Sequence, residues 1–136
     1  MVQQGDSRKR RKRMKQNNDD TFWLWDLKVE TIAGEAPMVC DHAPGSGFTV
    51  EGENIIMGPG GRFPLYALAA LLPLLPAKQR PTQETDWMTT DAEVACPDPH
   101  CGGRFRISRT SKREFRHAQT TGLPDRRETP YWQSDA

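Results

Sequence analysis

The stretch FWLWDLKVETI, residues Phe22–Ile32, carries the clearest structural signal in the chain. Its large apolar side chains recur at every second residue, at Trp23, Trp25, Leu27 and Val29. Polar side chains alternate with them, at Asp26, Lys28 and Glu30. A period of two is typical of a β-strand with one buried face. We therefore expect a half-buried strand, with the tryptophans packed in the core and the charged side chains on the outer face.

The sequence after this strand predicts a β-hairpin. In FTVEGENIIMGPGG, two short runs at Phe48–Val50 and Asn54–Met57 flank the turn sequence EGE. Apolar runs separated by a short polar segment that contains glycine are typical of paired antiparallel strands. The sequence GPGG then closes the hairpin.

Residues 62–81, RFPLYALAALLPLLPAKQRP, predict the one helix that packs on the sheet. Pro64 suits a first helical turn, and Pro73 should end or kink the helix near Leu72. Leucines recur at spacings of three and four, at Leu65, Leu68, Leu72 and Leu75. We expect this leucine stripe to face the core. The apolar run is interrupted by prolines and is shorter than the ~20 residues that a membrane span needs.

A second hairpin is predicted near the end of the folded part. Glu93–Cys96 forms one strand, PDPHCGG the turn, and Arg104–Arg109 the return strand, on which Phe105 and Ile107 should face inward. Together these elements predict a single small α+β domain over residues 21–118, with a mostly antiparallel sheet and one packed helix.

The two ends of the chain differ from this domain in composition. The run RKRRKRMK, residues 8–15, holds seven of the nineteen basic residues and leaves twelve basic against eighteen acidic residues elsewhere. We expect a disordered basic tail over residues 1–20 and a loose C-terminal tail over residues 119–136. A basic block of this kind contacts nucleic acid, an anionic surface or an acidic partner, or simply keeps the chain solvated.

Cysteine usage depends on the compartment of the protein. The basic run is followed by QNNDD rather than by an apolar stretch, so no signal peptide is expected and a cytoplasmic location is predicted. In that compartment three cysteines argue against a disulfide framework and in favour of thiolate chemistry or metal binding.

Five residues form a candidate metal site: Cys40, His42, Cys96, His100 and Cys101. Structural zinc sites use four tetrahedral ligands, commonly with two cysteines close in sequence. Four residues separate Cys96 from Cys101, and two residues at an alternate spacing, such as Cys40 and His42, share a face on an extended chain. We predict that Cys40, His42, Cys96 and Cys101 bind zinc, with iron as the second candidate metal.

Alternatives to this ligand set remain open from the sequence. His100 is an alternate ligand, although it adjoins Cys101 and adjacent side chains usually point apart. The cysteines could also be a chance cluster of thiols or a redox pair. A redox motif normally has two residues between its cysteines and a helix after them, whereas a strand is predicted after Cys101.

Several of these blocks resemble a family of short, uncharacterised bacterial proteins. Members have a cysteine-containing segment before a GDxF-like strand, a central apolar helix and a closing W…C-x-D…F-x-I-x-R block. The matching parts here are Cys40, GSGF, LYALAALLPLL and DWMTTDAEVACPDPHCGGRFRISR. Ser46 and Gly47 stand where that family has its acidic pair. The resemblance spans about residues 22–118 and implies a shared domain without implying an activity.

Three functions are compatible with these features. The favoured one is a small, non-catalytic, metal-stapled accessory subunit of a larger bacterial metabolic enzyme. This role is analogous to that of the small cysteine-rich subunits of enzymes that decarboxylate aromatic acids. No HExxH sequence, phosphate-cradling glycine loop or nucleophile triad is recognisable, and we predict no catalytic residue.

The second function is a nucleic-acid-binding regulator that uses basic residues to contact phosphates. Its candidate residues are Arg8, Lys9, Arg10, Arg11, Lys12, Arg13, Arg104 and Arg106. The third function is a small metalloenzyme whose open zinc or iron site activates water or acts on an aromatic substrate.

Overall fold

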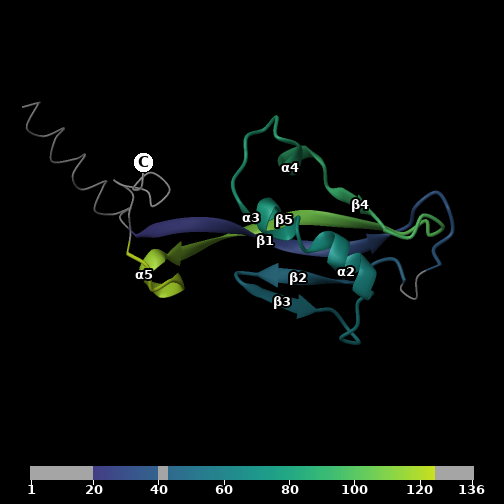
Figure 1. The fold of residues 1–136 in the computed structure, drawn as a ribbon, viewed down its shortest axis with the longest axis horizontal. Helices are drawn as coiled ribbons and strands as arrows, with labels where there is room; N and C mark the ends of the chain where they lie inside the picture. Colours follow the sequence, from purple (N-terminus) through teal and green to yellow (C-terminus); the bar gives the residue numbers. More distant parts are fainter. Residues whose placement is uncertain (1–19, 40–42, 125–136) are drawn as a thin grey trace, which may run out of the picture. The chain divides into compact units, whose positions relative to one another are not determined.

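The computed structural model describes residues 20–39 and 43–124, and within them the chain forms an α+β fold. A five-stranded antiparallel sheet has the order β3-β2-β1-β5-β4, with β1 and β5 running side by side at its centre (Figure 1). Its strands are β1 (Thr21–Ile32), β2 (Gly47–Glu51), β3 (Asn54–Met57), β4 (Glu93–Ala95) and β5 (Arg104–Arg116). The helices of the described residues are α2 (Leu65–Leu71), α3 (Leu75–Gln79), α4 (Trp87–Thr90) and α5 (His117–Thr120).

The chain divides into two compact units. The larger one is Leu24–Arg113, and the described part of the smaller one comprises residues 20–23 and 114–124. In the smaller unit the rings of Phe22 and Phe115 stack with their centroids 5.3 Å apart. The backbone N–H of His117 donates to the carbonyl oxygen of Asp20, so this unit joins the two ends of the described chain.

The core lies on one face of the sheet in the larger unit. Leu27 and Val29 of β1, predicted to face inward, are buried there. They belong to a cluster with Phe48, Val50, Ala67, Leu71, Leu75, Phe105 and Ile107. Trp25 packs against this cluster and is only partly buried. The predicted strand over 22–32 is therefore confirmed, and of its predicted apolar face Leu27 and Val29 lie in the core, whereas Trp23 and Trp25 are only partly buried.

Asp26 contradicts the expected alternation, because it is 7% exposed instead of lying on an outer face. Arg113 donates to both of its carboxylate oxygens, from Nε at 3.0 Å and from Nη2 at 2.8 Å. The backbone N–H of Gly52 donates to Oδ1 as well, at 3.2 Å. A carboxylate can be buried when it is paired and hydrogen-bonded in this way. The sequence pattern missed Asp26 because Arg113 lies 87 residues away.

The hairpin β2–β3 follows the prediction. Thr49 pairs with Ile56, and the turn residue Gly52 has a φ of +62°, which favours glycine. Gly47 allows β2 to approach β1 closely, because a Cβ at this position would lie 1.9 Å from the carbonyl oxygen of Val29.

The apolar run 62–81 forms two short helices on the sheet. As expected, α2 ends at Leu71, with Leu72 as its C-cap before Pro73, and α3 follows. The face prediction holds only in part, because Leu75 is buried and Leu68 packs against the core, whereas Leu65 and Leu72 are exposed. The buried stripe is Ala67, Leu71 and Leu75, at spacings of four residues. A small alanine in that stripe lets the helix approach the sheet closely.

The closing hairpin β4–β5 is confirmed, and β5 continues further than predicted, to Arg116. Phe105 and Ile107 are buried, whereas Arg106 is exposed. No helix in the described part of the chain has both the length and the apolar character to cross a membrane.

Candidate metal centre and the adjacent groove

The two described cysteines lie at opposite ends of one turn, between β4 and β5. Cys96 opens the turn, and its backbone N–H donates to the carbonyl oxygen of Gly103 at 3.0 Å. Inside the turn the Asp98 side chain accepts from the N–H of His100, and the Asp98 carbonyl accepts from the N–H of Cys101. The predicted turn thus brings Cys96 and Cys101 into one local structure, in which His100 is exposed.

Cys101 is the buried member of the pair, with 6% of its surface exposed. Its Sγ accepts two backbone hydrogen bonds, from Val39 N at 3.3 Å and from Gly103 N at 3.4 Å. N–H groups directed at sulfur stabilise a thiolate, which is the metal-binding form, whereas burial opposes the charge. Cys101 is therefore in an environment that suits a metal ligand.

The segment before β2 packs tightly against this turn. The N–H of Gly102 donates to the carbonyl oxygen of Pro37 at 3.0 Å. A Cβ at Gly102 would lie 1.9 Å from the Ala36 carbonyl oxygen, and a Cβ at Gly34 would lie 2.1 Å from the Gly102 carbonyl oxygen. Only glycine allows the two backbones to approach so closely. The glycines therefore hold residues 34–39 beside Cys101.

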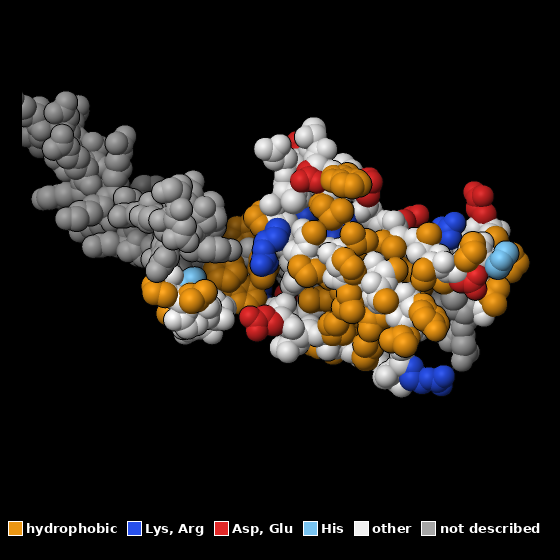
Figure 2. All heavy atoms as spheres, viewed as in Figure 1, with side chains coloured by type: hydrophobic (Ala, Val, Ile, Leu, Met, Phe, Trp, Pro, Cys, Tyr) orange, Lys and Arg blue, Asp and Glu red, His pale blue; other side chains and the backbone are white. Residues whose placement is uncertain are grey.

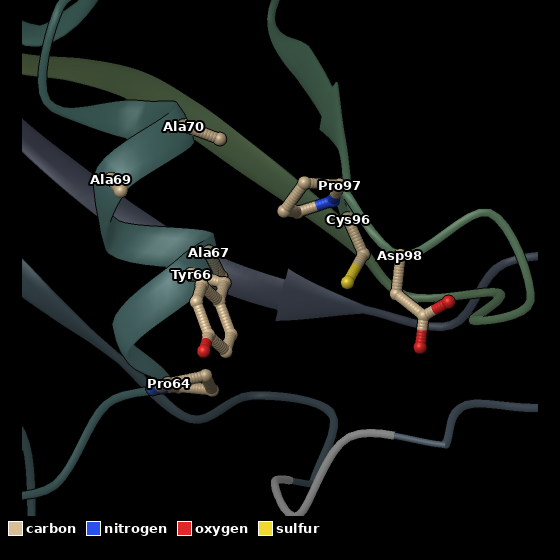
Figure 3. A pocket seen from close by; sticks show the side chains of 8 residues that line it. All are labelled: Pro64, Tyr66, Ala67, Ala69, Ala70, Cys96, Pro97 and Asp98. Carbon is tan, nitrogen blue, oxygen red and sulfur yellow. The ribbon is translucent and has the colours of Figure 1, made fainter.

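Cys96 lines a groove next to this turn. The groove has a volume of about 780 Å³ and lies between α2 and the start of the turn. Figure 3 shows the sulfur of Cys96 directed into it, opposite Tyr66. The remaining lining residues are Pro64, Ala67, Ala69, Ala70, Pro97 and Asp98. The wall is therefore almost entirely apolar, with Asp98 as its one charged group.

The structure describes two of the four predicted ligands, Cys96 and Cys101. Cys40 and His42 lie outside the described residues, as does the basic run Arg8–Arg13. Across residues 20–39 and 43–124, no three His, Cys, Asp or Glu side chains are grouped so that they could hold a metal ion. A metal at this turn would need further ligands from outside these described residues.

The described arginines named as anion-binding candidates have partners within the protein. Arg106 forms an ion pair with Glu93 at 3.2 Å, and Arg104 donates to the carbonyl oxygen of Gly103. Farther along β5, Arg109 donates to the carbonyl oxygens of Lys78 and Arg80, and Arg113 binds Asp26. The two ion pairs reduce the positive charge that Arg106 and Arg113 can offer to phosphates.

Sequence reasoning missed Tyr66 and Val39 at this site. Tyr66 is 78% exposed at the groove because the helix buries its alanine and leucine stripe instead of the leucine stripe that we expected. The spacing of Ala67, Leu71 and Leu75 was the available signal. Val39 acts through its backbone N–H, which no side-chain pattern marks.

Comparisons of the chain with protein-family models, with curated proteins and with solved structures found no match.

Proposed function

We propose that this protein is a metal-stapled binding module, in which a zinc ion fastens the segment before β2 to the turn between β4 and β5. The observation that carries the proposal is the buried Cys101 sulfur with its two backbone N–H donors. These donors stabilise a thiolate without neutralising it, which leaves the sulfur able to bind a cation. Iron is the second candidate metal.

The second half of the site comes from the residues that follow Val39. Val39 already donates to the Cys101 sulfur, and consecutive Cα atoms are about 3.8 Å apart. Cys40 therefore needs no long excursion of the chain to reach the same metal ion. In this proposal Cys40 and His42 join Cys96 and Cys101, and the exposed His100 is the alternate fourth ligand.

The partner is a larger protein with an apolar segment that binds the groove beside Cys96. Figure 2 shows apolar side chains gathered over α2 and the β2–β3 hairpin. Tyr66 and Leu65 of α2 are among the exposed large apolar residues. Exposed apolar surface around a concave site is typical of binding surfaces in proteins. The metal would support the turn that forms one wall of the groove.

Metal content measured by mass spectrometry on the full chain, purified without a histidine tag, tests the staple. We expect about one equivalent of zinc, as in a four-ligand structural site. Replacement by serine of Cys40, Cys96 or Cys101 should each remove it. His100→Asn is the matched control and should retain the metal if His42 is the fourth ligand. A wild-type chain without bound metal, after expression with added zinc or iron, would refute the staple.

A glycine variant tests the geometry without touching a ligand. Gly102→Ala places a methyl group against the Ala36 backbone and should push residues 34–39 away from Cys101. We expect weaker zinc binding in competition with a chelator. Gly122→Ala, with no atom within 4 Å of the new Cβ, is the control. Equal zinc affinity in the two variants would argue against a site shared by the two segments.

A small metalloenzyme is the second candidate, and the groove favours it. Cavities of about 300–1,000 Å³ with mostly apolar walls are typical of small-molecule sites. A metal held by the Cys96 sulfur would be reachable from this groove. X-ray absorption spectroscopy of the metal-loaded protein separates the two functions, because four protein ligands describe a staple, whereas three ligands and a water describe an open catalytic site.

A further inference from the structure

A second pocket, with a volume of about 650 Å³, lies on the face of the sheet opposite to the helices α2 and α3. Phe105 and Ile107 of β5 are buried in the core, so Arg104 and Arg106 point to the opposite face and line this pocket. Glu93 of β4 pairs with Arg106 in the ladder and lines it too. The remaining lining residues are Ile32, Ala33, Gly34 and Glu35. The pocket therefore shares no residue with the groove beside Cys96.

The segment after β1 forms one wall of this pocket and is held by close backbone contacts. A Cβ on Gly34 would lie 2.1 Å from the Gly102 carbonyl oxygen and 3.4 Å from Cγ of Arg104. The aliphatic part of the Arg104 side chain thus packs against the Gly34 backbone. On the other side of Glu35, the carbonyl oxygen of Pro37 accepts from the N–H of Gly102 at 3.0 Å. These contacts fix the backbone of Glu35 near Arg104 before any ligand binds.

The four charged groups of the pocket are not all paired with one another. Arg106 and Glu93 form an ion pair at 3.2 Å. The guanidinium of Arg104 donates from Nη1 to the carbonyl oxygen of Gly103 at 2.9 Å, which leaves its charge in place. Across the described residues, no carboxylate forms an ion pair with Arg104, and no cation forms one with Glu35. The pocket therefore offers a positive and a negative group to a ligand.

The chemistry of these two groups defines the ligand. A guanidinium binds a carboxylate through paired N–H donors, and a carboxylate accepts from an ammonium group. A simple anion would meet the charge of Glu35, and a simple cation would meet that of Arg104, so each would be repelled by one of the two groups. Ile32 and Ala33 add apolar surface to the pocket. Its volume lies in the range of about 300–1,000 Å³ that small-molecule sites have.

We propose that this pocket binds small zwitterions that carry an aliphatic group. The ligand carboxylate binds the Arg104 guanidinium, its ammonium binds the Glu35 carboxylate, and its aliphatic group contacts Ile32 and Ala33. Free amino acids and short peptides share this chemistry. The site is additional to the metal staple, because none of these four residues is a proposed metal ligand.

A series of probes tests the charge requirement on the wild-type full chain, by nuclear magnetic resonance titration of its backbone amides. L-leucine and L-leucyl-L-leucine carry both charges, leucinamide lacks the carboxylate, and 4-methylpentanoate lacks the ammonium. At least one zwitterion should give saturable shifts at Glu35 and Arg104. Each singly charged analogue should bind at least about tenfold more weakly, because it loses a hydrogen bond to a charged group. Tighter binding of leucine assigns the pocket to amino acids, and tighter binding of the dipeptide assigns it to peptides.

Variants of the two charged groups test their separate roles. Arg104→Gln should weaken zwitterion binding about tenfold and abolish the preference for leucine over leucinamide. Glu35→Gln should have a similar effect on affinity and abolish the preference for leucine over 4-methylpentanoate. Arg80→Gln and Glu84→Gln are the matched controls, since both residues are exposed and lie outside the pocket lining. They should bind the probes as the wild type does.

Two results on the wild-type protein would overturn the proposal. One is the absence of saturable shifts with both zwitterions up to the solubility of each probe. The other is equal affinity for leucine, leucinamide and 4-methylpentanoate. These measurements need no variant, so they remain decisive if a variant does not fold. Zwitterion binding that neither Arg104→Gln nor Glu35→Gln weakens would place the ligand elsewhere and would also overturn the proposal.

Zwitterion binding is distinguishable from the metal staple. Arg104→Gln should weaken binding of the probes and retain about one equivalent of zinc, because it leaves the proposed ligands unchanged. A wild-type chain that binds a zwitterion in this pocket without any metal would refute the staple alone. A chain that holds zinc and binds neither zwitterion would refute the pocket alone.

Discussion

The two edges of the sheet are built differently. At the β4 edge, Glu93 forms an ion pair with Arg106, and the segment that leads into the strand is held by the side chain of Lys78. At the β3 edge, the strand has neither charges nor side-chain anchors among the described contacts. Besides the backbone pairing of the strands, the described side-chain hydrogen bonds to that hairpin lie at its turn, where Gly52 binds Asp26 and Gln79.

The approach to β4 contains a polar network that has no equivalent among the described side chains of β3. Lys78 is 4% exposed, and its ammonium donates to the carbonyl oxygens of Met88 and Asp91. Arg109 donates to the Lys78 carbonyl oxygen, so β5, α3 and the approach to β4 form one polar network. A network of this kind fixes the approach to β4. The β3 side has apolar area instead.

The largest effect is expected from Lys78→Ala. Burial lowers the pKa of Lys78, with Arg109 lowering it further, yet the ammonium supplies the carbonyl groups of Met88 and Asp91 with donors. Removing the side chain should lower the free energy of unfolding by about 3 kcal/mol. Urea denaturation measures this change.

Two variants show whether the network is responsible. Lys78→Met retains the packing of the aliphatic part of the side chain and removes only the hydrogen-bond donors of the ammonium. Most of the decrease in the free energy of unfolding should therefore remain. Lys28→Ala is the control, because Lys28 is exposed and its Nζ lies 3.8 Å from Oε2 of Glu30. This variant should change the free energy of unfolding by less than about 0.5 kcal/mol. A stable Lys78→Met protein would mean that the carbonyl groups do not need the ammonium.

Asp26→Asn should have a smaller effect on stability. Asp26 is in β1 and accepts a hydrogen bond from Gly52 of the β2–β3 turn. The hydrogen bonds from Arg113 lower the pKa of Asp26 against the opposing effect of burial, and the N–H of Gly52 contributes. Loss of the charge should reduce the free energy of unfolding at neutral pH by about 2 kcal/mol. Because the folded pKa is below the ordinary value of 3.8, this stabilisation is complete above that pH and is lost as the pH falls through the folded pKa.

Thermal denaturation as a function of pH measures the second part of this prediction. The wild type and Asp26→Asn should differ in stability at neutral pH and converge in strong acid. A constant difference between them at all pH values would show that packing, rather than ionisation, explains the loss.

The smallest effect is expected from Glu93→Ala. The Glu93–Arg106 pair is about half exposed, and such pairs contribute roughly 0.5 kcal/mol. Thermal denaturation should therefore show a small change, and sedimentation should show no new association, because Lys78 still holds the approach to β4. New self-association through β4 would mean that this single charge protects the edge.

The sequence predicted the periodic parts of this fold. β1, the β2–β3 hairpin and the inward residues of β5 follow alternating patterns whose period is set by backbone geometry. The end of α2 before Pro73 also followed from the chain itself, since proline restricts the residue before it. The choice of helix face did not, because two stripes of apolar residues compete on α2 and only contact with the sheet decides between them.

The candidate site likewise has features that the sequence predicted and features that it did not. Cys96 and Cys101 could be chosen from the sequence, because residue type and spacing carry the chemistry of thiolate ligands. Spacing could not show that Cys101 is buried under the N–H of Val39, which lies 62 residues away. Nor could it show that Cys96 faces a groove beside α2, or that Arg106 and Arg113 have acidic partners.

By itself, then, the sequence determined the strands and the apolar helical run, but not the short helices α4 and α5, and it supplied candidate ligands by residue type. These properties depend on local backbone preferences and on side-chain chemistry. Tertiary structure alone decided that Asp26 is buried, that Tyr66 is exposed and that the β3 edge has no described neighbour. Each of these depends on which distant segments meet in space, as when Arg113 stabilises the Asp26 carboxylate that the local pattern would place in solvent.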